Sequence, residues 1–121
     1  MTTNAENNYP VRQYRKLEIG EQIIVGADPA DAQDFCAGVA MSKKYLDCPI
    51  VYNAIQESSQ FGYELNNLAK YIYNETHMWP KIAVERNTGL ATIYVLKELN
   101  YPDLFRMVDF SASSSQEKGG I

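Results

Sequence analysis

The sequence predicts a single α/β domain built around a mixed β-sheet. Three apolar segments that suit β-strands come first, and segments with helical periodicity then alternate with short apolar strands. A chain of 121 residues is long enough to bury one modest core. The order of three strands, helix, strand, helix and strand predicts an antiparallel meander followed by right-handed crossovers, with helices packed against the sheet.

The first strand is predicted at residues 22–27, a continuous apolar run rich in β-branched residues that suits a central strand. Pro29 cannot donate a ladder hydrogen bond, so this strand must end near Asp28. Residues 1–19 precede it and are polar at their start, which predicts a flexible N-terminal arm. The arm carries a basic cluster, which we interpret as solvated in preference to a phosphate contact. The cluster consists of Arg12, Arg15 and Lys16.

The meander is completed by strands predicted at residues 35–41 and 49–56, with a polar turn at 42–48. Ser58 or Ser59 then suits the N-cap of a helix, because a serine hydroxyl accepts from the free N–H groups of the first turn. Apolar residues recur at helical spacing until near Thr76, shortly before Pro80.

The last elements are a short apolar strand at residues 81–85, a second helix and a final strand at 104–108. Thr88 is a candidate cap for the second helix, and the Asn-Tyr-Pro-Asp segment at 100–103 ends it. Residues 109–121 are rich in Ser and Gly and predict a flexible tail.

Two acids stand where apolar strands end, Asp28 and Glu85. A carboxylate in such a place is expensive to desolvate unless it is paired or holds a metal. In the predicted layout the two strands are neighbours, so the acids converge at one end of the sheet, where ligands of open α/β sheets bind. They would form half of a shell for Mg²⁺ or Mn²⁺. The alternatives are a turn cap for Asp28, before Pro29, and a surface ion pair of Glu85 with Arg86.

The net charge of −4 and the pI of about 4.9 argue against binding to nucleic acid through a broad basic field. They do not argue against a metal-dependent nuclease, because bound cations offset the acids. No stretch approaches the roughly 18 apolar residues of a membrane span, and the N-terminus lacks the apolar core of a signal peptide. We therefore expect a cytoplasmic protein.

Three segments resemble the C-terminal nuclease domain of phage terminase large subunits, in the order that the family has them. They are Val-Gly-Ala-Asp-Pro-Ala at 25–30, Val-Glu-Arg-Asn-Thr-Gly at 84–89 and Leu-Asn-Tyr-Pro-Asp-Leu-Phe-Arg at 99–106. The resemblance covers residues 20–108 and implies an RNase H-like domain. It also implies a two-metal endonuclease, dependent on Mg²⁺ or Mn²⁺, that cuts double-stranded viral DNA during packaging.

On this resemblance Asp28 matches the aspartate expected to bridge both ions, and Glu85 matches the acid of the fourth strand. Asn87 and Gly89 match small or polar positions just after that acid. Asp34 and Asn87 are candidates for residues that contact the metal ligands without binding the metal themselves. In the host cell, such a protein would act in the cytoplasm with other packaging proteins, such as the small terminase subunit or the portal.

The chain also departs from the family. The third acid that the family needs lies well beyond the fifth strand; Asp103 does not match it and Asp109 is a poor substitute, so the RNase H-like domain is incomplete at its C-terminus. The Gly-rich phosphate loop of the ATPase domain is absent from the sequence. We therefore expect a fragment or short relative of a terminase nuclease that is weak or inactive alone. The alternatives are a catalytically dead binding module that contacts a packaging or host protein, and an inactive truncated prophage product.

Overall fold

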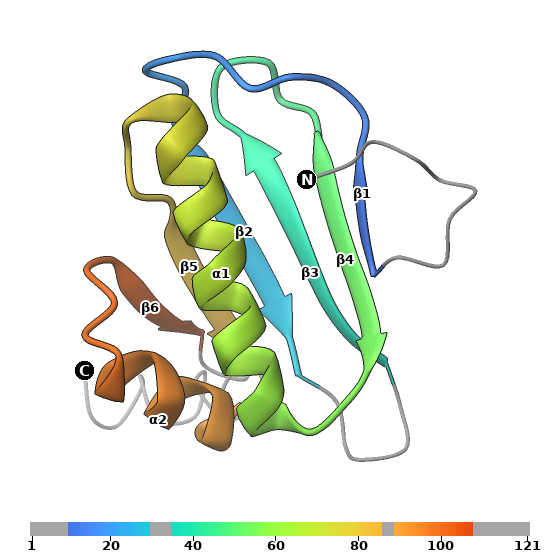
Figure 1. The fold of residues 1–121 in the computed structure, drawn as a ribbon, viewed down its shortest axis with the longest axis vertical. Coiled ribbons are helices and arrows are strands. Elements are labelled where there is room, and N and C mark those ends of the chain that lie inside the picture. The colour runs from blue at the N-terminus through green and yellow to red at the C-terminus, as the bar shows by residue number, and fades with distance from the viewer. Residues whose placement is uncertain (1–9, 30–34, 86–88, 108–121) are drawn as a thin grey trace, which may run out of the picture.

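A computed structural model describes residues 10–29, 35–85 and 89–107. It contains a six-stranded mixed sheet in the order β1-β4-β3-β2-β5-β6, with both helices on one face (Figure 1). The strands are β1 Val11–Gln13, β2 Ile23–Asp28, β3 Phe35–Ser42, β4 Ile50–Ile55, β5 Lys81–Glu85 and β6 Leu104–Met107, and the helices are α1 Ser58–Thr76 and α2 Leu90–Glu98. The predicted α/β class with a mixed sheet is confirmed.

The sheet joins an antiparallel half to a parallel half. β2, β3 and β4 form the expected meander, with β2 antiparallel to β3 and β3 antiparallel to β4. α1 then carries the chain across to β5, which lies parallel to β2, and α2 carries it to β6, parallel to β5. The expectation that the strands ending in Asp28 and Glu85 are neighbours is therefore confirmed.

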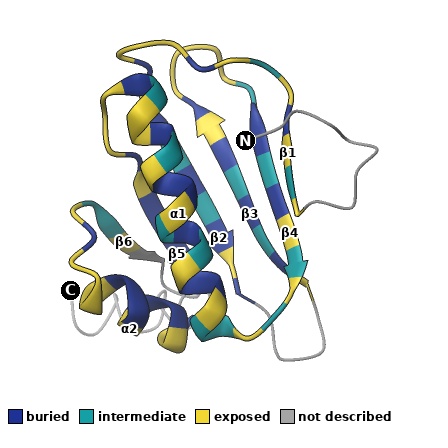
Figure 2. Ribbon diagram, in the orientation of Figure 1, coloured by how far each residue is buried: buried dark blue, intermediate teal, exposed yellow. Residues whose placement is uncertain are grey.

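The hydrophobic core lies between the sheet and α1, because alternate residues of each strand point to the helices. On β2 the alternation places Ile23, Val25 and Ala27 in the core, and each is at most 4% exposed (Figure 2). α1 contributes its own apolar stripe, in which Phe61 stacks on Tyr52 of β4 with ring centroids 5.7 Å apart.

The two helices meet closely near the start of α1. A Cβ on Gly62 of α1 would lie only 2.8 Å from Cβ of Val95 on α2, so this contact requires a residue without a side chain. Beside it the hydroxyl of Thr92 donates a 2.6 Å hydrogen bond to the carbonyl oxygen of Ser58. These contacts fix α2 at the end of the sheet where β2 and β5 finish (Figure 1).

The arm predicted over residues 1–19 is wrong for residues 11–13, which form the edge strand β1. β1 pairs antiparallel with β4, and the amide side chain of Gln13 accepts a 2.8 Å hydrogen bond from the hydroxyl of Tyr71 on α1. Three residues are too few for a periodic signal, so only the pairing partner reveals the strand. The tail predicted over 109–121 lies outside the described residues.

Arg15 is not a solvated tail residue either, because it holds two carboxylates beyond the ends of β1, β2 and β3. Its guanidinium lies 2.6 Å from Oε2 of Glu21 and 2.8 Å from Oδ2 of Asp47. Glu21 is 2% exposed and also accepts hydrogen bonds from the hydroxyl of Ser42 and the backbone N–H of Glu18. The hydrogen bond from Arg15, opposed by burial, lowers the pKa of Glu21 to about 2.

The boundaries of α1 agree with the prediction, but its N-cap does not. Glu57 occupies that position without a side-chain hydrogen bond, and the helix begins at Ser58. His77 ends the helix in the left-handed region, with φ 64°, and donates its backbone N–H to the carbonyl oxygen of Tyr73. The cap of α2 is Gly89, while Thr88 lies outside the described residues.

Candidate metal centre

Asp28 and Glu85 are the last residues of two parallel, hydrogen-bonded strands. In the register of β2 and β5, Ala27 pairs with Val84, so the next residue on each strand is one of the two acids. Neighbouring strands lie about 4.8 Å apart, which sets the scale of the separation between the two backbones. The register thus brings together residues that are 57 positions apart in the sequence.

Both acids belong to the face of the sheet opposite α1. On β2 the core residues alternate with Ile24, Gly26 and Asp28, so Asp28 lies on the opposite face. On β5 Ile82 and Val84 belong to the core, so the next residue, Glu85, also lies on the opposite face. Asp28 is exposed and Glu85 is half-buried. Two carboxylates on one face at one strand end can share a cation while water or a substrate oxygen reaches the same ion.

The start of α2 packs directly against the end of β5. A Cβ added to Gly89 would lie 2.2 Å from the carbonyl oxygen of Glu85 and 2.7 Å from Cγ1 of Val84. Only glycine permits this approach, and it sets the N-terminus of α2 against the backbone of Glu85. A helix N-terminus favours nearby negative charge, so α2 supports a carboxylate or a phosphate at this end of the sheet.

Among the described residues, no other acid that the sequence suggested lies beside Asp28 and Glu85. Asp103 lies at the opposite end of β5, where it accepts a 2.9 Å hydrogen bond from the ammonium of Lys81. This position agrees with the expectation that Asp103 is not the third acid. Asp34, Asn87 and Asp109 lie outside the described residues. Within the described ranges no group of three His, Cys, Asp or Glu side chains gathers to hold a metal.

Two carboxylates at the ends of two neighbouring strands suit a magnesium-type site better than a structural zinc or calcium site. Mg²⁺ usually keeps several waters and is held by one or two carboxylates together with substrate phosphates, whereas Ca²⁺ takes six to eight oxygens. The exposed position of Asp28 leaves room for those waters. The donor set therefore fits Mg²⁺ or Mn²⁺, with most ligands supplied by solvent and substrate.

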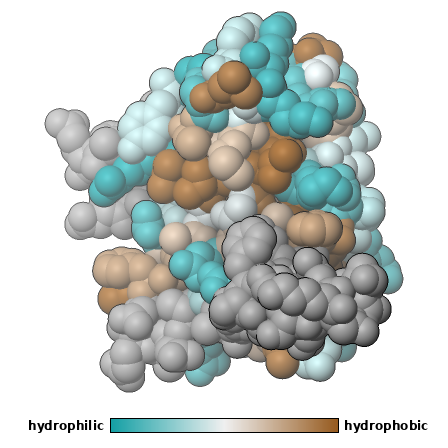
Figure 3. Space-filling model, turned by 180° about the vertical axis from the view of Figure 1, so that it is seen from behind, coloured by the Kyte–Doolittle hydropathy of each residue, from teal (hydrophilic) through white to brown (hydrophobic). Residues whose placement is uncertain are grey.

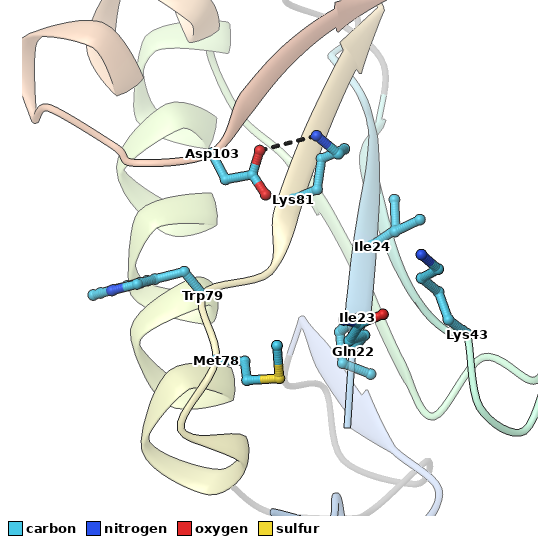
Figure 4. Close-up of a pocket in the computed structure, with 8 residues that line it drawn as sticks. All are labelled: Gln22, Ile23, Ile24, Lys43, Met78, Trp79, Lys81 and Asp103. Carbon is cyan, nitrogen blue, oxygen red and sulfur yellow. Dashed lines mark hydrogen bonds and ion pairs between the residues drawn. The ribbon is translucent and has the colours of Figure 1, made fainter. Parts of the chain in front are cut away.

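A cleft of about 190 Å³ opens at the other end of β2 and β5, and sequence reasoning did not find it. Met78 points across it toward β2, and Lys43 extends along Ile24 (Figure 4). The ring of Trp79 turns toward α1 and stacks on Tyr73, with centroids 4.4 Å apart. Because the lining comes from four separate segments, no local motif marks it. The lining residues are Gln22, Ile23, Ile24, Lys43, Met78, Trp79, Lys81 and Asp103.

The chain has the fold of a solved phage nuclease. It superposes on the large terminase nuclease from the thermophilic phage G20c with a TM-score of 0.72 and 12% sequence identity. The match covers 95% of this chain and 59% of that one, so this chain spans less than two thirds of the solved nuclease. The predicted RNase H-like class, drawn from the terminase resemblance, is thereby confirmed for the fold.

Comparison of sequences adds no relative. No protein-family model matches the chain, and a search of curated proteins finds no match. None of the helices in the described ranges has the length and apolar character of a membrane span.

Proposed function

We propose that this chain is an RNase H-like nuclease module that hydrolyses phosphodiester bonds of double-stranded DNA with Mg²⁺ or Mn²⁺, as a fragment or short relative of a terminase nuclease. The observation that carries the proposal is the register of β2 and β5, which sets Asp28 beside Glu85 on one face of the sheet. The fold shared with a large terminase nuclease supports it. A related role in packaging viral DNA is part of the same proposal.

Asp28 and Glu85 act in this proposal as metal ligands and not as proton donors. The two neighbouring carboxylates would hold the cation on the exposed face of the sheet. The scissile phosphate would be oriented there, with the side opposite its leaving group open to an attacking water. A cation held by Asp28 and Glu85 would supply a water of lowered pKa for the attack and would stabilise the leaving oxygen. The N-terminus of α2, held against Glu85 through Gly89, favours the phosphate charge at the same end.

We expect the isolated chain to be a slow enzyme. Two metals clamp the attacking and leaving oxygens best when several carboxylates hold them, and the described residues supply two at this site. The second ion would then rely on water and substrate oxygens, and its occupancy would need millimolar metal.

Nicking of supercoiled plasmid DNA tests the proposal. With millimolar Mn²⁺ the wild-type chain should convert supercoiled to open-circular DNA, and both Asp28→Asn and Glu85→Gln should lower the rate at least tenfold. Asp103→Asn is the matched control, because it removes an acid at the opposite end of β5, and it should nick like the wild type. Equal nicking by all four proteins, or none by the wild type, would rule out this activity for the chain.

A second candidate function is a binding module that keeps the fold and acts through protein contacts, with a packaging or host protein as partner. The observation that favours it is a set of exposed apolar side chains on the sheet, among them Met41 at 40% and Phe105 at 52% exposure. A chain that nicks DNA only when Asp28 and Glu85 are intact would count against this candidate.

A further inference from the structure

The cleft where β2 and β5 begin has an apolar wall that is open to solvent. Ile24 of β2 forms one side of it, and Met78, in the connection between α1 and β5, points across it (Figure 4). Trp79 follows Met78 and is 40% exposed. Seen from behind, hydrophobic side chains gather in the upper half of the view, with hydrophilic ones around them (Figure 3). Met and Trp are residue types that are enriched at protein interfaces.

Two ammonium groups line the same cleft, and they differ in their partners. Lys81 forms a 2.9 Å ion pair with Asp103, which offsets its charge. Lys43 extends along β2 (Figure 4), and within the described ranges no hydrogen bond or ion pair holds its ammonium. Lys44, the next residue, is held by Glu18 at 3.0 Å. The cleft therefore offers one unpaired positive charge, from Lys43, beside an apolar wall.

The size and charge of the cleft indicate the class of ligand that it fits. Its volume of about 190 Å³ is smaller than the roughly 300–1,000 Å³ of most small-molecule sites, and it suits a single large side chain. A nucleic acid is a poor match, because Asp103 would face its closely spaced phosphates. A single carboxylate matches the one unpaired ammonium, and an apolar side chain next to it would lose its exposed surface to the wall.

We propose that this cleft binds an extended segment of another protein. The segment places an apolar side chain against Ile24 and Met78, and the carboxylate of a neighbouring Asp or Glu on the ammonium of Lys43. Apolar burial supplies most of the affinity, while the charge pair fixes the orientation of the segment. The site lies at the opposite end of β2 and β5 from Asp28 and Glu85, so it does not depend on the proposed nuclease activity.

Short peptides test the cleft directly, with EDTA present. Trp79 is the one tryptophan of the chain, so its fluorescence reports on the cleft that it lines. Acetyl-Leu-Asp-Leu-amide should change this fluorescence with a dissociation constant on the order of 1 mM, because one anchor side chain gives only weak binding. It should also shift the backbone amide signals of Ile24 and Lys43 in NMR spectra. Acetyl-Leu-Lys-Leu-amide should bind at least fivefold more weakly.

Substitutions at two adjacent lysines test the charge pair. Lys43→Gln should weaken the acidic peptide at least fivefold, whereas Lys44→Gln is the matched control and should leave its affinity unchanged, because Glu18 already holds that ammonium. Met78→Ala should also weaken the peptide, since it removes part of the apolar wall. Circular dichroism checks that each variant is folded.

Three results would overturn the proposal: no binding of the acidic peptide to the wild-type chain, equal affinity for both peptides, or equal weakening by the two lysine substitutions. A short DNA duplex that displaced the peptide signals from Ile24 and Lys43 would overturn it in favour of a nucleic-acid contact. Because EDTA removes divalent metal, failure here leaves the nuclease proposal intact, and failure to nick DNA leaves this site intact.

Discussion

Glu21 shows how one buried charge can join three segments of the chain. Its carboxylate meets Arg15, Ser42 and the backbone of Glu18, and Arg15 in turn holds Asp47. A buried carboxylate is destabilising unless every lone pair has a partner, and here the partners come from the segment between β1 and β2 and from the last residue of β3. The network therefore ties the edge strand β1 to the meander.

The Glu21 network predicts a defined loss of stability in acid. The pKa of Glu21 falls from 4.5 to about 2 on folding, so its stabilisation is complete above about pH 4.5 and is lost as the pH falls toward 2. Glu21→Gln should lower the free energy of unfolding by about 3 kcal/mol at pH 7, and by much less near pH 2. Urea unfolding at both pH values measures this.

Glu98→Gln is the matched control for that change, because Glu98 is exposed on α2 and its substitution should leave the free energy of unfolding nearly unchanged. A Glu21→Gln variant as stable as the wild type at pH 7, or one whose deficit is the same at both pH values, would contradict the role given to the network.

At the scale of elements, the segments predicted from the sequence are those that carry a strong local signal. β2 ends where Pro29 removes a donor, and α1 has a long apolar stripe, so both were predicted within a residue or two. β1 and the N-cap of α1 were missed, because a three-residue edge strand and a cap without a side-chain bond depend on tertiary partners. The two acids were found because they end strands; the cleft was not, since distant segments build it.

The docking of α2 on β5 predicts the effect of adding one methyl group. Gly89→Ala places a Cβ only 2.2 Å from the carbonyl oxygen of Glu85, so the backbone must shift, and the change should lower the free energy of unfolding by about 2 kcal/mol or more. Gly26→Ala is the control on the neighbouring strand, where the added carbon would meet only Cε of Met41 at 3.5 Å. Equal stability of the two variants in urea would show that α2 is not held in this way.

At the scale of the molecule, the fold presents two different faces. One is covered by α1 and α2, and the other carries Asp28 and Glu85 together with exposed apolar side chains such as Met41 and Phe105. The net charge of −4 gives no general attraction for DNA, so recognition of a phosphodiester must come from a locally bound cation. The nuclease proposal therefore depends on whether Asp28 and Glu85 hold one.

Binding of Mn²⁺, followed by the electron paramagnetic resonance signal of the free ion, tests this most directly. The wild-type chain and Asp103→Asn should reduce the free-ion signal equally at millimolar Mn²⁺, whereas Asp28→Asn and Glu85→Gln should each weaken binding at least tenfold. That result would establish that the acids ending β2 and β5 share a metal. A signal that all four proteins reduce to the same extent would contradict it, because the ion would then bind elsewhere.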